Sequence, residues 1–584
     1  MKPVAFKDLA FVFEKLEQTS SNTAMIEILA KFLPQLSPQE AKITAYLLSG
    51  KVGPSFSAPE FGMAEKMIGR AAAQAFDIPL TRITRMAVKS GDLGAVAEQV
   101  AAGRGASLSI LAVFEQLTQI AHISGTGAQK DKIDKLAALL RRANPVEAKY
   151  IVRTVLGTHR IGAAEMTFLQ GLSKSVGGSK HDKPALEYAY NVLSDLGEVA
   201  FRASRGGLNS LKRVSPKPGV PVRMMLATRV QDLDEVPLHL QGSLFAEYKY
   251  DGERVQIHKN ADGTMRVFSR RLEDITHQYP EVIADVQKHL TARSAIIEGE
   301  VVAIDPKTKR LLPFQILMQR KRKHKIERYQ KEVPVALFLF DALYLNGKNL
   351  LSAPLSDRKR LLATHLKQDA VVSIGAFVRT DETSEVEKYF HEAISHGAEG
   401  LVIKGTSSPY QAGHRGWYWI KFKKEYEQEL VDTFDVVVVG ALYGKGSRTG
   451  SYGSLLAAAF DPKTNKYYSF TKVGAGLTDD LLRSLPRTLK PYAIPKKHRL
   501  VETSMKMDVW FDPAKVIEIS GADLTVSPVH TVAKGKLEKG GIALRFPRLL
   551  RIRDDKTAEQ ATTVQEIWDM YKQRARPARA TKRK

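Results

Sequence analysis

The sequence predicts a multi-domain chain of the α and α+β classes, in which a helical part is followed by a mixed α+β part and then by a small β-barrel. Three observations predict this order. Residues 1–212 carry helix-start signals and apolar residues at helical spacing. Strand patterns begin after a proline-rich break at residues 215–221. After residue 424 the strand patterns become short and are joined by glycine-rich segments.

We therefore expect domains at residues 1–212, 213–424 and 425–571, and a basic tail at residues 572–584. The tail holds seven Lys/Arg residues and no acidic residue. A charge run of this kind is typical of a disordered, solvated chain end, and we favour that reading over a dedicated DNA-binding arm.

Two helix starts are clear in the first part. Residues 37–40 (Ser-Pro-Gln-Glu) combine a capping box with proline at the first helical position, and Gly50 can end that helix. Residues 144–147 (Asn-Pro-Val-Glu) repeat the pattern, and Gly157 can close the second helix. The loop at residues 157–162 fits an ordinary turn between helices or a phosphate contact at a helix N-terminus.

The middle part alternates strands with short helices. Residues 245–259 and 264–270 flank Ala-Asp-Gly and predict a hairpin, with Val255 and Ile257 on one face of the first strand. If extension holds through Asp251, Lys249 and Asp251 share a face. Further strands are expected at 295–304, 335–345 and 400–404, and a helix at 384–396.

Residues 435–440, 455–460 and 467–473 predict the short strands of the barrel, which we expect to be an OB-fold. Residues 440–451 are rich in glycine and basic residues. They are not a P-loop, because Gly440 and Gly444 have the wrong spacing and Lys445 precedes glycine. We interpret the segment as a barrel loop that can contact phosphates.

Composition narrows the class of protein. The 584 residues carry 88 Lys+Arg against 63 Asp+Glu, a formal net charge of +25, which favours a polyanionic partner such as nucleic acid. There are no cysteines, so disulfides and thiolate zinc sites are excluded. The start lacks a secretory signal, and the most apolar stretch, residues 333–345, is too short to span a bilayer. We expect a protein without a membrane partner.

The octet Glu247-Tyr-Lys-Tyr-Asp-Gly-Glu-Arg254 is the most informative segment. Lys249 stands between acidic residues and is followed by Asp251 and Arg254. A lysine attacks an electrophile only as the neutral amine, and at its ordinary pKa only about one molecule in a few thousand is neutral at pH 7. Carboxylates can recruit a metal cation and arginine can hold a phosphate. These parts suit attack of a lysine on a nucleotide α-phosphate.

Further motifs follow the octet along the chain. They are Glu298-Gly-Glu300, residues 338–347, Glu399-Gly-Leu-Val-Ile-Lys404, Trp419-Ile-Lys421-Phe-Lys423, residues 545–556 and residues 559–563. In this order the octet and these motifs resemble the motif series of the covalent nucleotidyltransferases, which include ATP-dependent DNA ligases, RNA ligases and mRNA capping enzymes. The motif sequences are most similar to those of the ATP-dependent DNA ligases of archaea, of some bacteria and of eukaryotic replication, and the resemblance covers nearly the whole chain.

This resemblance implies a helical DNA-binding domain, an adenylation domain and an OB-fold domain, and sealing of nicks in duplex DNA in three steps. Lys249 takes AMP from ATP and releases pyrophosphate. AMP then passes to the 5′-phosphate of the nick, and the 3′-hydroxyl finally displaces AMP. Such transfers depend on in-line positioning and charge neutralisation. The resemblance also favours a DNA contact by Arg160.

The resemblance implies a role for each remaining site residue. Glu247 should read the adenine edge and Phe340 should stack on the base, although Phe340 also fits a core aromatic. The nucleotide and nick phosphates should be held by Arg254 and Arg270, and the α-phosphate and pyrophosphate side by Arg415, Lys421, Lys423 and, in the same shell, Lys404.

Mg²⁺, or Mn²⁺ in its place, should be bound by Glu300, Glu399 and Asp251, with Glu300 also contacting the ribose. We expect the cations on the phosphate side to lower the pKa of Lys249. The alternation of Lys421 and Lys423 about Phe422 also fits a solvated strand face with Phe422 in the core.

The last basic motif should visit the triphosphate during lysine adenylylation and move away when DNA is bound, which requires a joint near residues 423–434. Its candidate residues are Arg545, Arg548, Arg551, Arg553 and Lys556, and the sequence does not assign their separate roles.

An RNA ligase or a capping-type enzyme is the nearest alternative, and a non-catalytic DNA-binding protein with a ligase fold is a second. NAD-dependent ligases carry a zinc module built from cysteines, and this chain has no cysteine, which excludes that class. We expect a monomer that uses ATP and nicked double-stranded DNA, in the cytoplasm and associated with the nucleoid of a prokaryote. No sliding-clamp or repair partner can be identified from the sequence, and neither the choice between replication and repair nor the preferred metal can be decided.

Overall fold

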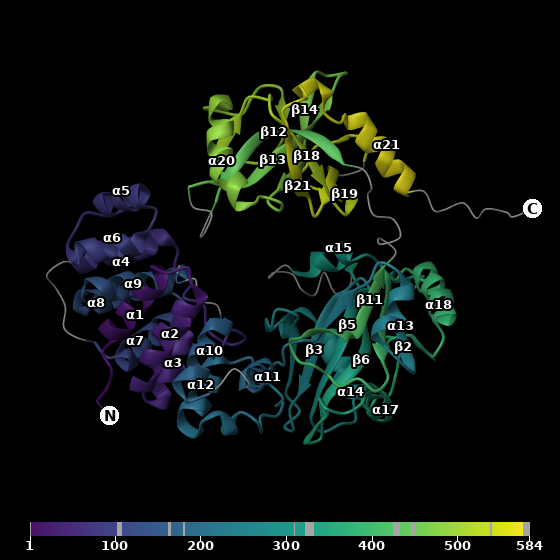
Figure 1. Cartoon of the computed structure of the whole chain (residues 1–584), viewed down its shortest axis with the longest axis horizontal. Helices are drawn as coiled ribbons and strands as arrows, with labels where there is room; N and C mark the ends of the chain where they lie inside the picture. Colours follow the sequence, from purple (N-terminus) through teal and green to yellow (C-terminus); the bar gives the residue numbers. More distant parts are fainter. Residues whose placement is uncertain are drawn as a thin grey trace, which may run out of the picture. The chain divides into compact units, whose positions relative to one another are not determined.

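The computed structural model describes residues 2–575, with gaps at 102–107, 160, 162–164, 179–181, 309, 322–331, 424–432, 445–449 and 538–539. Residues 576–584 are not described, nor are the side chains of residues 319, 321 and 573–575. The chain divides into two compact units, Met1–Lys423 and Lys424–Lys584, coloured along the chain in Figure 1. The proline-rich segment 215–221 lies inside the first unit. Arg160, most of the tail and part of the loop at 440–451 lie outside the described residues.

The first part of unit one is helical, as the sequence predicts. Its helices are α1 (Phe6–Glu17), α2 (Asn22–Phe32), α3 (Pro38–Leu48), α4 (Glu65–Phe76), α5 (Leu80–Ser90), α6 (Leu93–Val100), α7 (Ile110–His122), α8 (Ala128–Arg142), α9 (Pro145–Leu156), α10 (Glu165–Ser175), α11 (Lys183–Leu193) and α12 (Leu196–Gly206), with short 3₁₀ turns at Leu33–Gln35 and Leu208–Ser210.

Both predicted capping boxes are present. Ser37 accepts a hydrogen bond from the Glu40 N–H, and the Glu40 carboxylate accepts one from the Ser37 N–H, at 3.3 and 2.9 Å. Asn144 and Glu147 make the same pair at the start of α9. Gly157 closes α9 with a positive φ of 67°, which glycine adopts without strain.

The middle part holds two sheets. The first has the order β1-β11-β10-β2-β9 and the second the order β4-β3-β5-β6-β7, with β8 beside β6. The strands are β1 (Leu226–Arg229), β2 (Leu244–Lys249), β3 (Glu253–Lys259), β4 (Met265–Ser269), β5 (Ala295–Ala303), β6 (Val335–Leu345), β7 (Lys348–Asn349), β8 (Val372–Ile374), β9 (Phe377–Thr380), β10 (Gly400–Gly405) and β11 (Arg415–Lys423).

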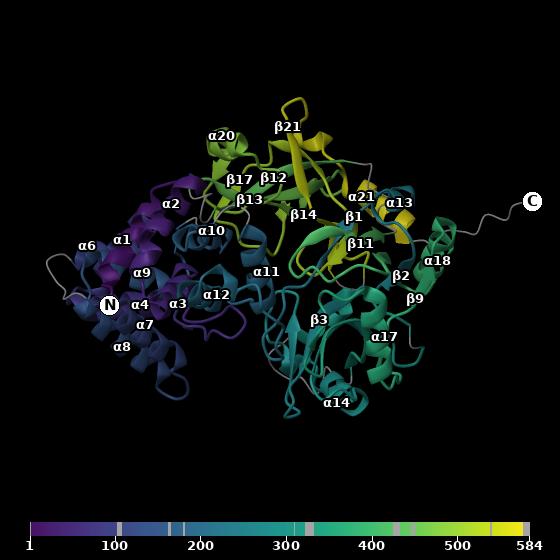
Figure 2. The ribbon, with the colours of Figure 1, turned by 60° about the horizontal axis from the view of Figure 1, so that its bottom comes forward.

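Helices cover one face of each sheet. In Figure 2, α18 (Thr383–Ser395) lies beside β2 and β9, and it packs on β2, β9 and β10. Helix α13 (Val236–His239) packs on β11 of the same sheet. Helices α14 (Pro280–His289) and α17 (Leu355–His365) cover the second sheet through β4, β6 and β8. The short helix α15 (Phe314–Leu317) packs on β5.

The predicted continuous strand at 245–259 is wrong. The chain leaves the first sheet after Lys249 and enters the second sheet at Glu253, so Lys249 and Asp251 do not share one extended strand. Gly252 occupies the crossing because a Cβ there would lie 2.4 Å from the carbonyl oxygen of Val301. The hairpin of β3 with β4 and the other predicted strands of this part are present.

In its described residues, unit two is a β domain that also contains helices. Its main sheet has the order β15-β17-β12-β13-β14-β16, β18 joins β12 to β21, and β19 pairs with β20. The elements are β12 (Phe434–Tyr443), β13 (Tyr452–Asp461), β14 (Lys466–Val473), α20 (Asp479–Leu489), β15 (Ala493–Ile494), β16 (Val501–Glu502), β17 (Val509–Phe511), β18 (Val516–Ser520), β19 (Asp523–Ser527), β20 (Gly541–Arg545), β21 (Arg548–Arg553) and α21 (Val564–Ala575).

The predicted fold class is confirmed: a helical first region, a central region of sheets with covering helices, and a C-terminal β domain. In the described part of the chain, no helix combines the length and the apolarity needed to cross a bilayer.

Candidate active site

Strand alternation turns one set of side chains of the first sheet away from its covering helices. On β2, Leu244 and Ala246 enter the apolar core beneath α18, so Glu247 and Lys249 project from the opposite face. On β10 and β11, core residues Leu401, Ile403, Ile420 and Phe422 alternate in the same way with Lys404, Trp419, Lys421 and Lys423. Phe422 is therefore a core residue, while its two lysine neighbours face the candidate site.

The second sheet shows the same separation of faces. Val255 and Ile257 of β3 lie in the core beneath α14 and α17, and Arg254 projects from the other face. On β5, Ile297 and Val301 are core residues, whereas the side chains of Glu298 and Glu300 point away from that core, as does Phe340 on β6. Contacts of Arg254 and Lys404 with both Phe340 and Trp419 join the two faces into one site.

Lys249 ends β2 beside the start of β10. The two strands pair Lys249 with Gly400, and the N–H of Glu399 donates to the Lys249 carbonyl at 2.8 Å. The Lys249 ammonium donates to Oε2 of Glu399 at 2.5 Å, and the Lys423 ammonium lies 2.7 Å from the same oxygen. The backbone register thus places the predicted nucleophile, a predicted metal ligand and a predicted phosphate ligand together.

The expected lowering of the Lys249 pKa is not what the structure shows. Burial lowers it, but Glu399, Glu300 and Asp251 together raise it more, so the pKa lies above its ordinary value. The carboxylates prevail because one of them contacts the ammonium directly. Burial raises the pKa of Glu399, yet the two neighbouring lysines and Asp251 bring it down to about 2, so this group stays ionised.

Three carboxyl groups face Lys249. Burial, with the charges of Glu399 and Glu253, raises the pKa of Glu300 to about 7 despite Lys249 and Arg254. Burial and Glu399 also raise the pKa of Asp251, whose Oδ2 accepts the N–H of Phe314 at 3.0 Å. Mutual repulsion of this kind is relieved by a divalent cation, so the donor set fits Mg²⁺.

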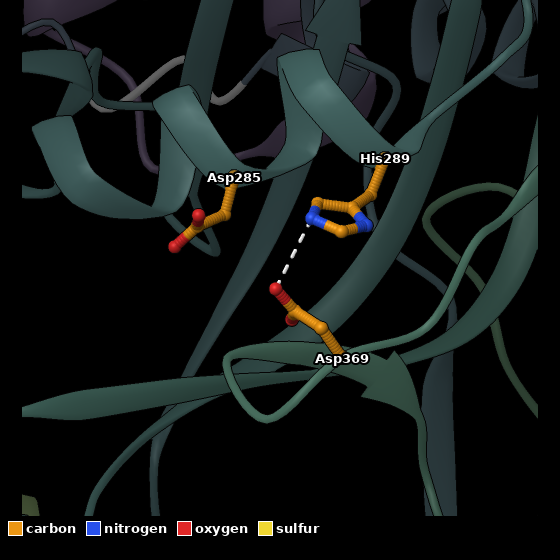
Figure 3. Close-up of side chains that lie close together, drawn as sticks. All are labelled: Asp285, His289 and Asp369. Carbon is orange, nitrogen blue, oxygen red and sulfur yellow. Dashed lines mark ion pairs between the residues drawn. The ribbon is translucent and has the colours of Figure 1, made fainter.

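The three carboxyl groups do not, however, converge as a closed cage. Among the described residues, the group of three metal-ligand side chains whose ligand atoms all lie within 4.8 Å of one another is Asp285, His289 and Asp369, shown in Figure 3. His289 Nε2 lies 3.1 Å from Oδ2 of Asp369, whose Oδ1 already accepts two backbone N–H groups. We interpret this second group as a self-paired His–Asp contact.

A group of cations lies on the phosphate side of the predicted site. Burial lowers the pKa of Lys421, and the charges of Arg415, Lys249, Lys423 and Arg270 lower it further. Burial also lowers the pKa of Arg270, as do Arg254 and Arg415. The structure therefore brings the predicted phosphate ligands within electrostatic reach of one another. Arg415 is exposed and donates to the Ala227 carbonyl at 3.1 Å.

The Arg254 side chain is held in place by hydrogen bonds to buried groups. Its guanidinium donates to the buried Glu298 at 2.7 Å and to the Met225 carbonyl at 2.6 Å, and Glu298 also accepts from the Tyr410 hydroxyl at 3.0 Å. Nε of Arg254 has no hydrogen-bond partner in the part of the chain that the structure describes. One edge of the arginine fork is thus fixed by protein while Nε keeps donor capacity. Sequence reasoning missed Tyr410 and gave Glu298 no role of its own, although the Glu-Gly-Glu spacing marks both glutamates for one strand face.

Glu247 is buried in the candidate site, where two lysines contact its carboxylate. Lys404 Nζ donates to its Oε2 at 2.6 Å, and Lys359 Nζ lies 3.0 Å from its Oε1. Lys404 also lies 4.5 Å from the centroid of the Phe340 ring and 4.1 Å from that of Trp419. Sequence reasoning missed Lys359, because Arg358, Lys359 and Arg360 form a basic run that reads as a solvated helix face, whereas the structure leaves only Arg360 exposed.

The last basic motif lies in unit two, where acidic residues hold three of its cations. Arg553 donates to Asp435 at 3.0 Å and Lys556 donates to the same carboxylate at 2.5 Å. Arg551 donates to Glu518 at 2.6 Å. Strand pairing of β18 with both β12 and β21 places Asp435, Glu518 and Arg551 in one row across the sheet.

Family profiles match most of the chain. The profile "DNA ligase N terminus" matches residues 5–173, "ATP dependent DNA ligase domain" matches residues 224–423, and "ATP dependent DNA ligase C terminal region" matches residues 448–556. The chain belongs to the ATP-dependent DNA ligase family. The recognition made from the motifs is confirmed, and with it the assignment of the chain as a DNA ligase enzyme.

Curated DNA ligases resemble this ligase over their full length. The DNA ligase of Aeropyrum pernix is 43% identical, with 98% of each chain covered. The DNA ligase of Staphylothermus marinus is 44% identical and covers 97% of this chain and 98% of its own. The solved structure "Pmar-Lig_Pre." superposes with a TM-score of 0.54 at 15% identity over 94% of this chain and 99% of its own, which supports the fold.

Proposed function

We propose that Lys249 is the nucleophile of this ligase and that the side chains which the two sheets turn toward each other form its adenylation site. The observation that carries the proposal is the placement of Lys249 Nζ against Glu399, with Glu300, Asp251 and Lys423 around it. These groups hold the amine in place, and the carboxylates and cations around it can bind a metal ion and phosphates, which positions the reactants for phosphoryl transfer to nitrogen.

In the first step the lone pair of Nζ attacks the α-phosphorus of ATP. The N–P bond forms, the bond between the α-phosphorus and the bridging oxygen breaks, and pyrophosphate leaves. A 5′-phosphate oxygen of the nick then displaces the lysine from the adenylate. The 3′-hydroxyl attacks the activated 5′-phosphorus in the third step, and AMP leaves. The ammonium must lose its proton first, and Glu399 holds its Nζ in place meanwhile.

The nucleotide would lie along the cationic side of the site. Glu247 and Phe340 would contact adenine, one through its edge and the other through its face. Phosphate oxygens would be neutralised by residues from both sheets, which in-line displacement requires. These residues are Arg254, Arg270, Arg415, Lys421 and Lys423.

Glu300, Glu399 and Asp251 would hold Mg²⁺, with waters and phosphate oxygens completing its shell. When bound, the ion supplies charge neutralisation at the phosphates. Mn²⁺ offers the same ligand chemistry. In unit two, Arg551, Arg553 and Lys556 would act on the triphosphate during lysine adenylylation.

The polymer substrate would be nicked duplex DNA, bound by a monomer through many phosphate contacts, in accord with the net charge of +25. We propose the cytoplasmic nucleoid of a prokaryote as the place of action.

The test uses the full chain with Mg²⁺ and ATP labelled at the α-phosphate. We expect an acid-labile covalent adduct that Lys249→Ala abolishes and that Lys348→Ala, a change at an exposed lysine of β7, leaves intact. Nicked DNA should discharge the adduct and become sealed. A GTP adduct would favour capping, joining of RNA ends alone would favour an RNA ligase, and no adduct on Lys249 would overturn the proposal.

A further inference from the structure

Two buried lysines converge on one buried carboxylate beneath the proposed nucleotide site. The side chain of Glu247 is 7% exposed, and those of Lys359 and Lys404 are 6% and 2% exposed. Burying one ammonium is costly and burying two against a single carboxylate is more so, because desolvation exceeds what one shared partner returns. An arrangement of this cost in an active site points to a function rather than to stability.

The two lysines hold Glu247 from different elements. Lys404 comes from β10, where it is paired with Phe245, two residues from Glu247 on the same face of the sheet. Lys359 comes from α17 and lies 4.5 Å from the ring centroid of Phe377. Carboxylate torsions are therefore fixed on both sides, by a strand and by a helix.

Helix α17 is held in place next to Lys359 by the hydrogen bonds of Arg358. The fully buried Arg358 makes a bidentate pair with Asp341 at 2.7 and 2.9 Å, and it donates to the carbonyls of Ala353 and Ser408. Asp341 lies on β6, one residue from Phe340. The backbone of the neighbouring Lys359 is therefore held in place beside Glu247.

The contact between Lys359 and Glu247 leaves one carboxylate oxygen of Glu247 able to accept a further hydrogen bond. Their 3.0 Å approach lacks hydrogen-bond geometry, so among the described residues neither Oε1 of Glu247 nor Nζ of Lys359 has a hydrogen-bond partner. Within the same described part of the chain, Nε1 of Trp419 also has none. Polar atoms left open in a buried site are matched by a ligand that brings the complementary groups.

We infer that Lys359 and Lys404 are positioning residues that select the nucleobase, because they fix the Glu247 carboxylate in place as the acceptor for the amino group at position 6 of a purine. The inference rests on the proposed adenylation site. An ionised carboxylate accepts hydrogen bonds and donates none. A 6-amino group donates to it, whereas the 6-oxo group of hypoxanthine or guanine presents a second acceptor and is repelled.

The test measures lysine adenylylation of the full chain with ATP and with ITP, which presents an oxo group in place of the 6-amino group. Weakening one charged hydrogen bond is worth about tenfold. Lys359→Met should raise the KM for ATP about tenfold, keep kcat within about twofold, and lower the preference for ATP over ITP about tenfold. Lys359→Arg should restore the preference. Arg360→Met, at the exposed next position of α17, is the matched control.

Lys359→Gln covers the case in which the methionine variant does not fold, because it keeps a donor without the charge and should lie between Met and Arg. An unchanged ratio of ATP to ITP in folded Lys359→Met or Lys359→Gln would overturn the inference, as would a wild-type chain that accepts both nucleotides equally. Absence of any adduct with ATP in the wild-type chain would instead remove the proposed function.

Discussion

Oε2 of Glu399 contacts two ammonium groups, that of Lys249 at 2.5 Å and that of Lys423 at 2.7 Å. One carboxylate oxygen thus connects the end of β2 to the end of β11. The proposed nucleophile is held in place by a group that also raises its pKa. In the proposed reaction Glu399 positions the amine, and binding of a cation to Glu399 would release it.

Glu399→Ala should therefore reduce lysine adenylylation by about 100-fold or more, because both the amine and the proposed metal lose their shared partner. The measurement is the single-turnover rate of adduct formation with labelled ATP. Glu392→Ala, at an exposed position on α18, should leave that rate within about twofold. A rate for Glu399→Ala close to that of the control would refute the assignment.

Asp341→Ala should destabilise unit one by about 3–5 kcal/mol, because Arg358 would be left buried and unpaired. Thermal or urea unfolding of the full chain measures the change. Asp357→Ala is the matched control on the same helix, since its pair with Arg360 is exposed and should cost less than about 1 kcal/mol. Equal shifts for the two variants would contradict the ranking.

Acid should destabilise the chain through His258. Nδ1 of His258 accepts the Gly219 N–H at 3.0 Å and its Nε2–H donates to Gln256 at 2.8 Å, so the neutral ring is satisfied. Burial, with a smaller effect of Arg266, lowers its pKa to about 3. Because the unfolded chain binds the proton more readily, this stability is complete above about pH 6.5 and is lost as pH falls toward 3.

Thermal unfolding between pH 4 and 7 tests this, with His258→Gln as the variant and His396→Gln, at an exposed histidine, as the control. The slope of Tm against pH should flatten in the His258 variant and stay unchanged in the control. An unchanged slope in His258→Gln would show that the ring does not carry the acid sensitivity.

Gly252→Ala should disrupt the crossing between the sheets. Its Cβ would meet the Val301 carbonyl oxygen at 2.4 Å, and a backbone atom cannot move aside. We expect adduct formation to fall about tenfold or more, because Lys249 and Asp251 flank the displaced segment. Gly53→Ala is the control, since its Cβ would meet Ala58 at an ordinary 3.5 Å. A fully active Gly252→Ala would show that the crossing tolerates a shift.

Binding of nicked duplex DNA should weaken steeply with salt. A chain of net charge +25 that contacts 6–10 phosphates loses about 10³–10⁵ in affinity between 50 and 200 mM salt, through release of counterions. Fluorescence anisotropy with a labelled nicked duplex measures this. Lysine adenylylation without DNA should change far less over the same range. A flat affinity would argue against extensive contact with the duplex.

Local sequence determined the elements. The capping boxes at Ser37 and Asn144, the hairpin turn at Gly263 and the shared face of Val255 and Ile257 on β3 all follow from short-range chemistry, and the structure contains each of them. The motif order determined the family. Local rules succeed here because caps, turns and strand faces are decided within a few residues of chain.

Only the tertiary structure determined which residues far apart in the sequence come into contact. The break of the predicted strand at Gly252, the pairing of Arg254 with Glu298, and the convergence of Lys359 and Lys404 on Glu247 depend on two sheets facing each other. The upward pKa of Lys249 has the same origin, because its sign is set by which charges lie nearest in space. Electrostatic energy depends on distance and burial, and a sequence fixes neither until the chain is folded.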